Sequence, residues 1–323
     1  MADSYVGGEL LAEVVRSDFV EGYHRGSVAV LDAAGRAIAA AGDVTGPIFP
    51  RSANKPLQAV GMLRAGLSLA DPADLALAAA SHRGEPMHIA RVRAMLAAAG
   101  LTEDDLACPP DLPIGADARA AVLAAGGGPA RVLANCSGKH TAMLRTCQAA
   151  GWPLDGYQLA HHPLQVALEA TVEELAGEPA AAVGVDGCGA AVFAMSLAAL
   201  AGCFLRLVSA PAGTHEAAVA DAMRGYPELV SGTGEAEARL MRELPGALVK
   251  GGAEGVLAVA VPGVGAVTLK IDDGARRPTM PVLASALRRL DVTAPVVAEL
   301  AEHAEGVAQK GGGRRVGTVR ALW

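Results

Sequence analysis

Apolar runs interrupted by short polar or glycine-containing turns occur near both ends of the chain. Residues 26–31 and 37–41 flank a polar turn, and residues 255–261 and 264–271 flank a Pro-Gly pair. Two apolar runs of strand length separated by turn residues are typical of a β-hairpin. The pattern therefore predicts one hairpin near each end of the chain, with residues 10–15 as a further strand before the first.

Most of the chain between these hairpins has apolar residues at three- and four-residue spacing, which is typical of amphipathic helices. The same spacing returns after the second hairpin. The clearest predicted helices cover residues 88–99, 164–176, 235–244, 278–290 and 293–302.

Strands at both ends with helices between them predict an α+β fold with one antiparallel sheet built from the two chain ends. The sheet is expected from about residues 8–45 and 248–273, and the inserted helical lobe from about residues 52–245. The glycine-rich pieces are too short for linkers, and the sequence contains no internal repeat. One domain over residues 1–323 is therefore expected.

Composition excludes several classes of protein. With 52% hydrophobic and 19% charged residues, the 323-residue chain is not disordered. A net charge of −7 without a long basic run makes nucleic acid an unexpected partner. The uncharged run 189–205 is rich in Ala and Gly and lacks an aromatic belt, so it predicts a buried helix and no membrane partner.

The start of the chain and its cysteines bear on the cellular compartment. The first residues lack a basic and apolar leader, so a cytoplasmic protein is expected. Five cysteines form an odd set in a long chain, which favours free or metal-bound thiols over a disulfide framework.

Lysine is rare, and its positions therefore carry information. Only five of the 27 basic residues are lysines. A buried ammonium group can lose its proton, whereas a guanidinium group cannot, so lysine can persist where arginine would fail. The lysines are Lys55, Lys139, Lys250, Lys270 and Lys310.

Ser52 and Lys55 lie at the start of a helical pattern, three residues apart. This spacing places the hydroxyl and the amine on one face of a helix. A desolvated amine can accept the serine proton and so create a nucleophile. The alternative is an N-cap serine beside a surface lysine.

Lys250 is followed by two glycines before the second hairpin. Glycines let the backbone approach a substrate closely, and the ammonium group can supply charge or relay a proton. An ordinary beginning of a strand explains the same residues.

Cys136, Lys139 and His140 lie at the head of a helical pattern, about fifty residues before Asp186 and Cys188. Two thiolates with a nitrogen donor or a carboxylate can bind zinc and leave one position open for water. The spacing matches no familiar zinc finger, and buried inert cysteines are the alternative. Asp186 can instead bind a substrate amine.

Ser81 and His82 are adjacent and do not predict a catalytic triad, because neighbouring residues on a helix or strand do not face each other. Ser81 stays a candidate hydroxyl at a helix end, with a capping serine as the alternative. The His161-His162 pair before Pro163 predicts the start of a helix and a structural role.

Taken together, the motifs resemble the L-asparaginase II family, also called class 3 asparaginases. Ser-x-x-Lys near the first hairpin and Lys-x-Gly on a late strand resemble the wider superfamily of serine β-lactamases, penicillin-binding proteins and serine-dependent glutaminases, which implies a β-lactamase-like fold. The resemblance covers nearly the whole chain, and its most specific phrases are VEGYHRG at 20–26, FPRSANKPLQ at 49–58, SHRGEP at 81–86, NCSGKH at 135–140 and GVDGCG at 184–189.

The resemblance implies hydrolysis of L-asparagine to L-aspartate and ammonia through a serine acyl-enzyme. It implies two Ser/Lys pairs, Ser52 with Lys55 and Ser81 with Lys250, and Ser52 is slightly favoured as the nucleophile. Lys250 is chosen over Lys270 for its Lys-x-Gly context.

The resemblance also implies a zinc ion held by Cys136, Lys139, Cys188 and water, with its role open. The charged groups of the substrate are expected to meet Arg51 and Asp186, with His140 nearby. A homodimer is expected by analogy with such enzymes.

Two other classes of function stay open. One is a serine-dependent glutaminase or a β-lactamase-type or penicillin-binding-type hydrolase. The other is a non-catalytic module of the same fold that binds a small molecule.

Overall fold

The structure is a computed structural model that describes residues 4–323. The chain divides into two compact units, each made of more than one segment. Unit 1 comprises Met1–Ala53, Ala194–Ser209 and Arg239–Trp323, and unit 2 comprises Asn54–Phe193 and Ala210–Ala238. The expected single domain over residues 1–323 stays a prediction.

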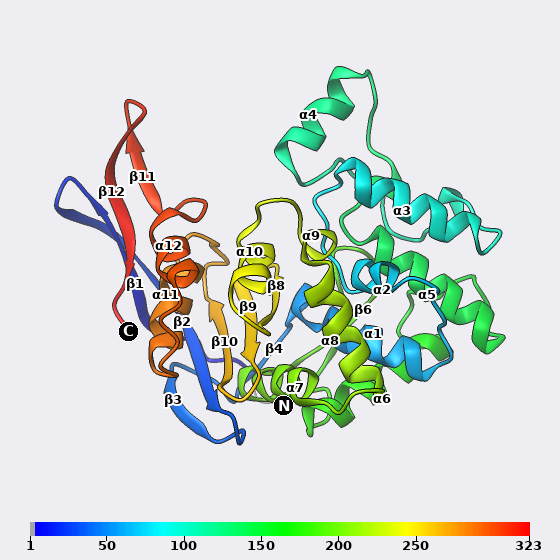
Figure 1. Cartoon of the computed structure of the whole chain (residues 1–323), viewed down its shortest axis with the longest axis horizontal. Helices are drawn as coiled ribbons and strands as arrows, with labels where there is room; N and C mark the ends of the chain where they lie inside the picture. Colours follow the sequence, from blue (N-terminus) through cyan, green and yellow to red (C-terminus); the bar gives the residue numbers. More distant parts are fainter. Residues whose placement is uncertain (1–3) are drawn as a thin grey trace. The chain divides into compact units, whose positions relative to one another are not determined.

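Unit 1 is built on an eight-stranded sheet in which every recorded strand pair is antiparallel (Figure 1). The strand order is β11-β12-β1-β2-β10-β9-β8, and β3 pairs with β2 off this path. The strands are β1 (Glu9–Arg16), β2 (Phe19–Asp32), β3 (Ala37–Ala41), β8 (Leu248–Gly252), β9 (Val256–Val261), β10 (Gly265–Ile271), β11 (Ala308–Gly311) and β12 (Arg314–Ala321).

Both predicted hairpins and the sheet built from both chain ends are confirmed. β2 pairs with β3 and also with β10, and β1 lies between β2 and β12, with Ala12 opposite Ala321. β11 and β12 extend the sheet beyond the expected residues. The arginines of β12 and the connecting glycines, Gly312 and Gly313, interrupt the apolar pattern that would predict these strands.

Three helices cover the sheet of unit 1. α7 (Leu197–Ser209) packs on β2, β9 and β10, and Leu197 O accepts a 2.8 Å hydrogen bond from Thr268 of β10. α11 (Thr279–Arg288) packs on β10 and β12, and α12 (Pro295–His303) packs on α11 and β12.

The run 189–205 contains the expected buried helix only in part. α7 begins at Leu197, whereas the earlier residues form β6 (Ala191–Phe193) and β7 (Met195–Ser196). β7 pairs with β4 (Pro47–Ile48). No helix within residues 4–323 combines the length and the apolarity needed to cross a membrane.

Unit 2 is largely helical, as expected. Its first helix, α1, is buried along most of its length and packs on α2, α5, α6 and α8. A short hairpin of β5 (Val183–Val185) and β6 also belongs to this unit. The helices are α1 (Lys55–Arg64), α2 (Pro72–Ala78), α3 (Pro86–Ala97), α4 (Ala116–Ala124), α5 (Ser137–Ala150), α6 (Pro163–Ala176), α8 (His215–Gly225) and α9 (Pro227–Val230); α10 (Ala236–Glu243) follows at the boundary.

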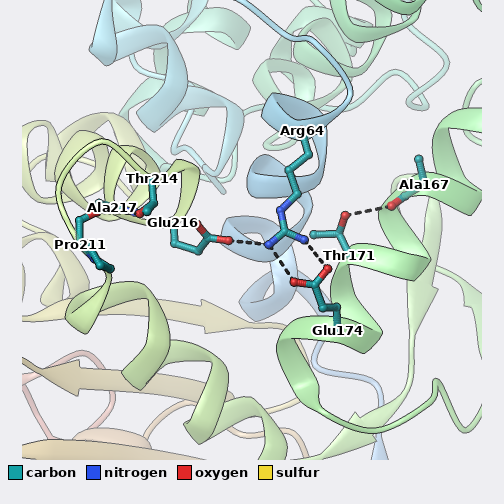
Figure 2. Close-up of polar contacts among 8 residues, drawn as sticks. All are labelled: Arg64, Ala167, Thr171, Glu174, Pro211, Thr214, Glu216 and Ala217. Atoms are coloured by element: carbon teal, nitrogen blue, oxygen red, sulfur yellow. Dashed lines mark hydrogen bonds and ion pairs between the residues drawn. The ribbon is translucent and has the colours of Figure 1, made fainter.

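One arginine connects three helices of unit 2 (Figure 2). Arg64 at the end of α1 donates to Glu174 of α6 over 2.8 and 3.1 Å and to Glu216 of α8 over 2.7 Å. Figure 2 also shows Thr171 of α6 donating to the carbonyl oxygen of Ala167 over 3.0 Å. Because these ion pairs are partly exposed, they orient the helices more than they stabilise them.

Candidate functional site

Lys55 and Ser81 are brought together inside unit 2. Lys55 is the first residue of α1, and Pro56 follows in the first turn, where a missing N–H costs least. The Lys55 side chain is buried, and its Nζ donates to Ala80 O over 2.6 Å and to Ser81 Oγ over 3.0 Å. The structure therefore places a buried amine on the hydroxyl of a serine 26 residues further along the chain.

The loop that carries Ser81 is bound to the end of α9 and to the residues that follow it. Ser81 N–H donates to Val230 O over 2.9 Å, and Glu85 accepts hydrogen bonds of 2.8 and 2.7 Å from the backbone and hydroxyl of Thr233. Arg83 forms an ion pair with Glu235. These contacts connect the loop that carries Ser81 to the segment 230–235.

Ser52 and Lys250 belong to unit 1. Ser52 lies in a 3₁₀ turn, Arg51–Asn54, and the φ of Arg51 is 52°, a left-handed conformation that strains a residue with a side chain. The Arg51 guanidinium lies 3.7 Å from Glu254. Lys250 of β8 is buried, and its Nζ donates to Gly251 O over 2.7 Å.

Gly252 brings strand β8 against the segment that carries Ser52. A Cβ at Gly252 would lie 2.3 Å from Pro50 O and 3.3 Å from Ala53 N. Glycine therefore permits a close approach of the two backbones. The expected pairs Ser52 with Lys55 and Ser81 with Lys250 each join residues of different units and stay predictions.

Cys136, Lys139, His140 and Cys188 converge in unit 2. Cys136 directly precedes α5, Lys139 and His140 lie in its first turn, and Cys188 lies in the turn between β5 and β6. All four side chains are buried. Both sulfurs and a ring nitrogen of His140 lie within 4.8 Å of one another, and Lys139 Nζ is 3.2 Å from Cys188 Sγ.

The charges in this cluster favour a thiolate beside an ammonium group. A hydrogen bond from the Cys136 thiol lowers the pKa of Cys188, and the charge of Lys139 lowers it further against the effect of burial. Hydrogen bonding with Cys108 and with Cys188, together with burial, raises the pKa of Cys136. Burial lowers the pKa of Lys139, but the negative charges of Cys188, Cys136 and Asp186 outweigh burial and raise it.

The hydrogen bonds around His140 determine where its ring proton lies. Tyr157 accepts a 2.9 Å bond from Ala107 N–H, and its hydroxyl lies 2.7 Å from His140 Nδ1. The buried Tyr157 O–H is satisfied by donating to Nδ1, which leaves the proton of the neutral ring on Nε2. Nε2 is buried and makes no hydrogen bond of good geometry within residues 4–323. In this tautomer Nε2 can donate to a sulfur, and it would bind a metal only after its proton had moved.

Two soft sulfurs and one nitrogen suit zinc better than a hard cation. With Cys136 and Cys188, the nitrogen of the ligand set can come from Lys139 Nζ or from His140 Nε2, in each case after that nitrogen has lost a proton. Asp186 is half-buried at the same turn, where its carboxylate accepts the N–H of Gly187 over 2.8 Å.

Two residues of this cluster were missed by sequence reasoning. Cys108 lies beside Cys136, and its thiol donates to Arg131 O over 3.4 Å. Tyr157 positions the ring of His140. Neither belongs to a recognisable motif, although a buried tyrosine is notable in a chain with 3% aromatic residues.

Comparison with protein families settles the relationship of the chain. The family model for L-asparaginase II matches residues 12–321. The chain belongs to the L-asparaginase II family. Membership supports an amidohydrolase that acts on a small molecule such as asparagine, and the match includes segments of both units.

Comparisons of this L-asparaginase II family member with curated proteins and with solved structures give no match or only matches of low sequence identity. No curated protein gives a significant match. A β-lactamase from Mycobacterium bovis (Mb2281c) is 18% identical, with a TM-score of 0.43 over 86% of this chain and 94% of its own. A putative β-lactamase from Bacteroides dorei is 16% identical, with a TM-score of 0.40 over 90% of this chain and 95% of its own.

Proposed function

We propose that the chain is an L-asparaginase that hydrolyses the side-chain amide of L-asparagine through a serine acyl-enzyme. Family membership supports amide hydrolysis in general terms. The observation that carries the serine mechanism is the 3.0 Å hydrogen bond between the buried Lys55 amine and Ser81 Oγ. The cytoplasmic location and the homodimer stay part of the same proposal.

In this mechanism, Ser81 Oγ attacks the amide carbon while the neutral amine of Lys55 takes up the serine proton. The C–N bond then breaks, and the departing nitrogen takes the proton from Lys55 and leaves as ammonia. Water then attacks the acyl carbon while Lys55 takes up a proton from the water; the ester bond to Ser81 Oγ breaks, and Oγ takes the proton back from Lys55. Because Ser81 N–H already donates to Val230 O, other donors must stabilise the oxyanion.

Ser52 is the second candidate nucleophile. The family resemblance of the sequence slightly favoured it as the nucleophile. The observed contact of Lys55 favours Ser81 instead. Arg51 and Asp186 stay the candidate partners for the carboxylate and the amine of the substrate.

Zinc fits the residues of the second cluster. Cys136, Cys188 and Lys139 would hold it, and the ion would supply positive charge and Lewis acidity when bound. Lys139 would have to lose a proton to become a ligand, so binding is expected to release protons. A pH-stat titration of the metal-free protein with zinc measures this release.

The decisive experiment measures ammonia release from L-asparagine and L-glutamine in parallel. Preference for asparagine supports the proposal, and preference for glutamine moves the chain toward the glutaminases. No release from either amide, with hydrolysis of a chromogenic β-lactam, would favour a penicillin-recognising enzyme. Ser68→Ala serves as a control, since Ser68 is exposed after α1 and belongs to neither cluster.

A further inference from the structure

One buried histidine joins the loop of Ser81 to the start of α5. His82 N–H donates to Asn135 O over 3.0 Å, and His82 Nε2 lies 2.9 Å from Ser137 Oγ. Asn135 and Ser137 flank Cys136. The residue that follows the candidate nucleophile therefore contacts both neighbours of a candidate metal ligand.

The direction of the side-chain bond follows from its surroundings. Ser137 has one hydroxyl proton, which it donates to Val132 O over 2.8 Å. Its oxygen must therefore accept from His82, so Nε2 carries the ring proton. His82 Nδ1 accepts the N–H of Gly84 over 3.2 Å. Both nitrogens of a neutral imidazole are thus satisfied.

Packing leaves this ring no freedom to turn. His82 is fully buried and stacks on His88, with ring centroids 5.1 Å apart and planes inclined by 15°. The helices themselves meet closely, since a Cβ at Gly138 of α5 would lie 2.6 Å from Leu77 O of α2. A shift of α5 is therefore transmitted to the loop after α2.

We propose that His82 is a positioning residue that fixes the Ser81 hydroxyl relative to the metal ligands Cys136, Lys139 and Cys188. Zinc binding is then expected to favour the aligned arrangement of Ser81 and Lys55. By thermodynamic linkage, this alignment in turn raises the affinity for zinc. The inference rests on the proposed function for the roles of these two groups.

The test compares zinc affinity, kcat and KM in two variants of His82. In His82→Leu, apolar atoms fill most of the space of the ring, but the N–H donor to Ser137 is lost. His82→Gln retains an N–H donor. Zinc affinity, measured by competition with a chromogenic chelator, is expected to fall about 10- to 100-fold in His82→Leu. kcat should fall with KM nearly unchanged, and His82→Gln should recover most of both losses.

A matched control separates positioning from general stability. His162 is also buried, and its ring bonds join Pro153 O (2.9 Å) and Leu164 N–H (3.1 Å) of its own segment. His162→Leu should lower the melting temperature without changing zinc affinity. If His82→Leu does not fold, Ser137→Ala removes the acceptor of the same bond and is measured in the same way.

Wild-type zinc affinity in folded His82→Leu or Ser137→Ala would overturn the proposal, and so would a wild-type protein that binds no zinc. Failure of the proposed function is a separate outcome. A wild type that binds zinc, shows the expected pattern of variants and releases no ammonia from L-asparagine would remove the asparaginase function but retain the coupling through His82.

Discussion

Lys55 lies in a buried position that suits an amine able to give up and accept a proton. It is buried at the start of α1 and donates to a carbonyl and a hydroxyl. A guanidinium group at this place could not accept a proton, which explains a lysine in an arginine-rich chain. The motif around Lys55 was visible in the sequence, whereas its contact with Ser81 depends on the loop after α2.

Replacement of each serine distinguishes the two candidate nucleophiles. Ser81→Ala is expected to lower kcat by about 10⁴-fold or more, because it removes the attacking oxygen. The free energy of unfolding should change by about 1 kcal/mol or less, since Lys55 keeps its bond to Ala80 O. Initial rates and thermal unfolding of Ser81→Ala and Ser52→Ala, side by side, test this. Full activity in folded Ser81→Ala would transfer the role to Ser52.

Lys55→Met tests the base itself. Methionine keeps the length and fills the buried space but cannot take up a proton. Loss of general base catalysis is expected to lower kcat by about 10²- to 10⁴-fold with the fold retained. Steady-state kinetics with circular dichroism measures both quantities, and turnover close to that of the wild type would exclude Lys55 as the base.

At the scale of elements, strand and helix patterns predicted most of what the structure contains. The two hairpins have continuous apolar strands, and α3 and α6 begin within two residues of the expected positions. β12 was missed because Arg314, Arg315 and Gly317 interrupt its apolar pattern. The cysteine cluster was predicted from its motifs, but the contacts of Cys108 and Tyr157 depend on tertiary packing alone.

The end of strand β8 should tolerate no side chain. A Cβ at Gly252 would meet Pro50 O at 2.3 Å, so Gly252→Ala must displace the segment that carries Ser52 or the strand that carries Lys250. A destabilisation of about 1–3 kcal/mol is expected. Gly22→Ala in β2 is the control, since no atom lies within 4 Å of its Cβ position. Urea unfolding of both variants tests this, and equal stabilities would contradict the close approach.

At the scale of the whole molecule, stability should depend on buried neutral histidines. Burial holds the pKa of His82 well below its usual value, and burial also lowers the pKa of His88. Below about pH 6.5, these histidines become protonated in the unfolded chain but stay neutral in the folded protein. The free energy of unfolding therefore falls as pH falls.

Between pH 7.5 and 5.5, this difference should cost about 1–3 kcal/mol for the two histidines together. Urea unfolding at both pH values measures the loss. His82→Gln removes one titrating group and should show a smaller loss than the wild type. An equal loss in the variant would show that His82 does not contribute.

The sheet of unit 1 should expose an edge that promotes aggregation when β11 and β12 are removed. Removal of residues after Gly306 deletes β11 and β12 and leaves β1 as an open edge. Exposed strand edges promote association, so the truncated chain is expected to aggregate. Light scattering after refolding, compared with the full chain, measures this. A monodisperse truncated protein with native circular dichroism would contradict it.

The partnership of β1 with β12 has a consequence for biosynthesis. β1 leaves the ribosome about 300 residues before its partner strand, Arg314–Ala321, is translated. At 5–20 residues per second, the N-terminal strands wait for about 15–60 s. During that interval, β1 and β2 can pair with each other, but the edges that later pair with β12 and β10 have no partner. Its yield in a cell should therefore depend on ribosome-associated chaperones more than the stability of the finished protein suggests.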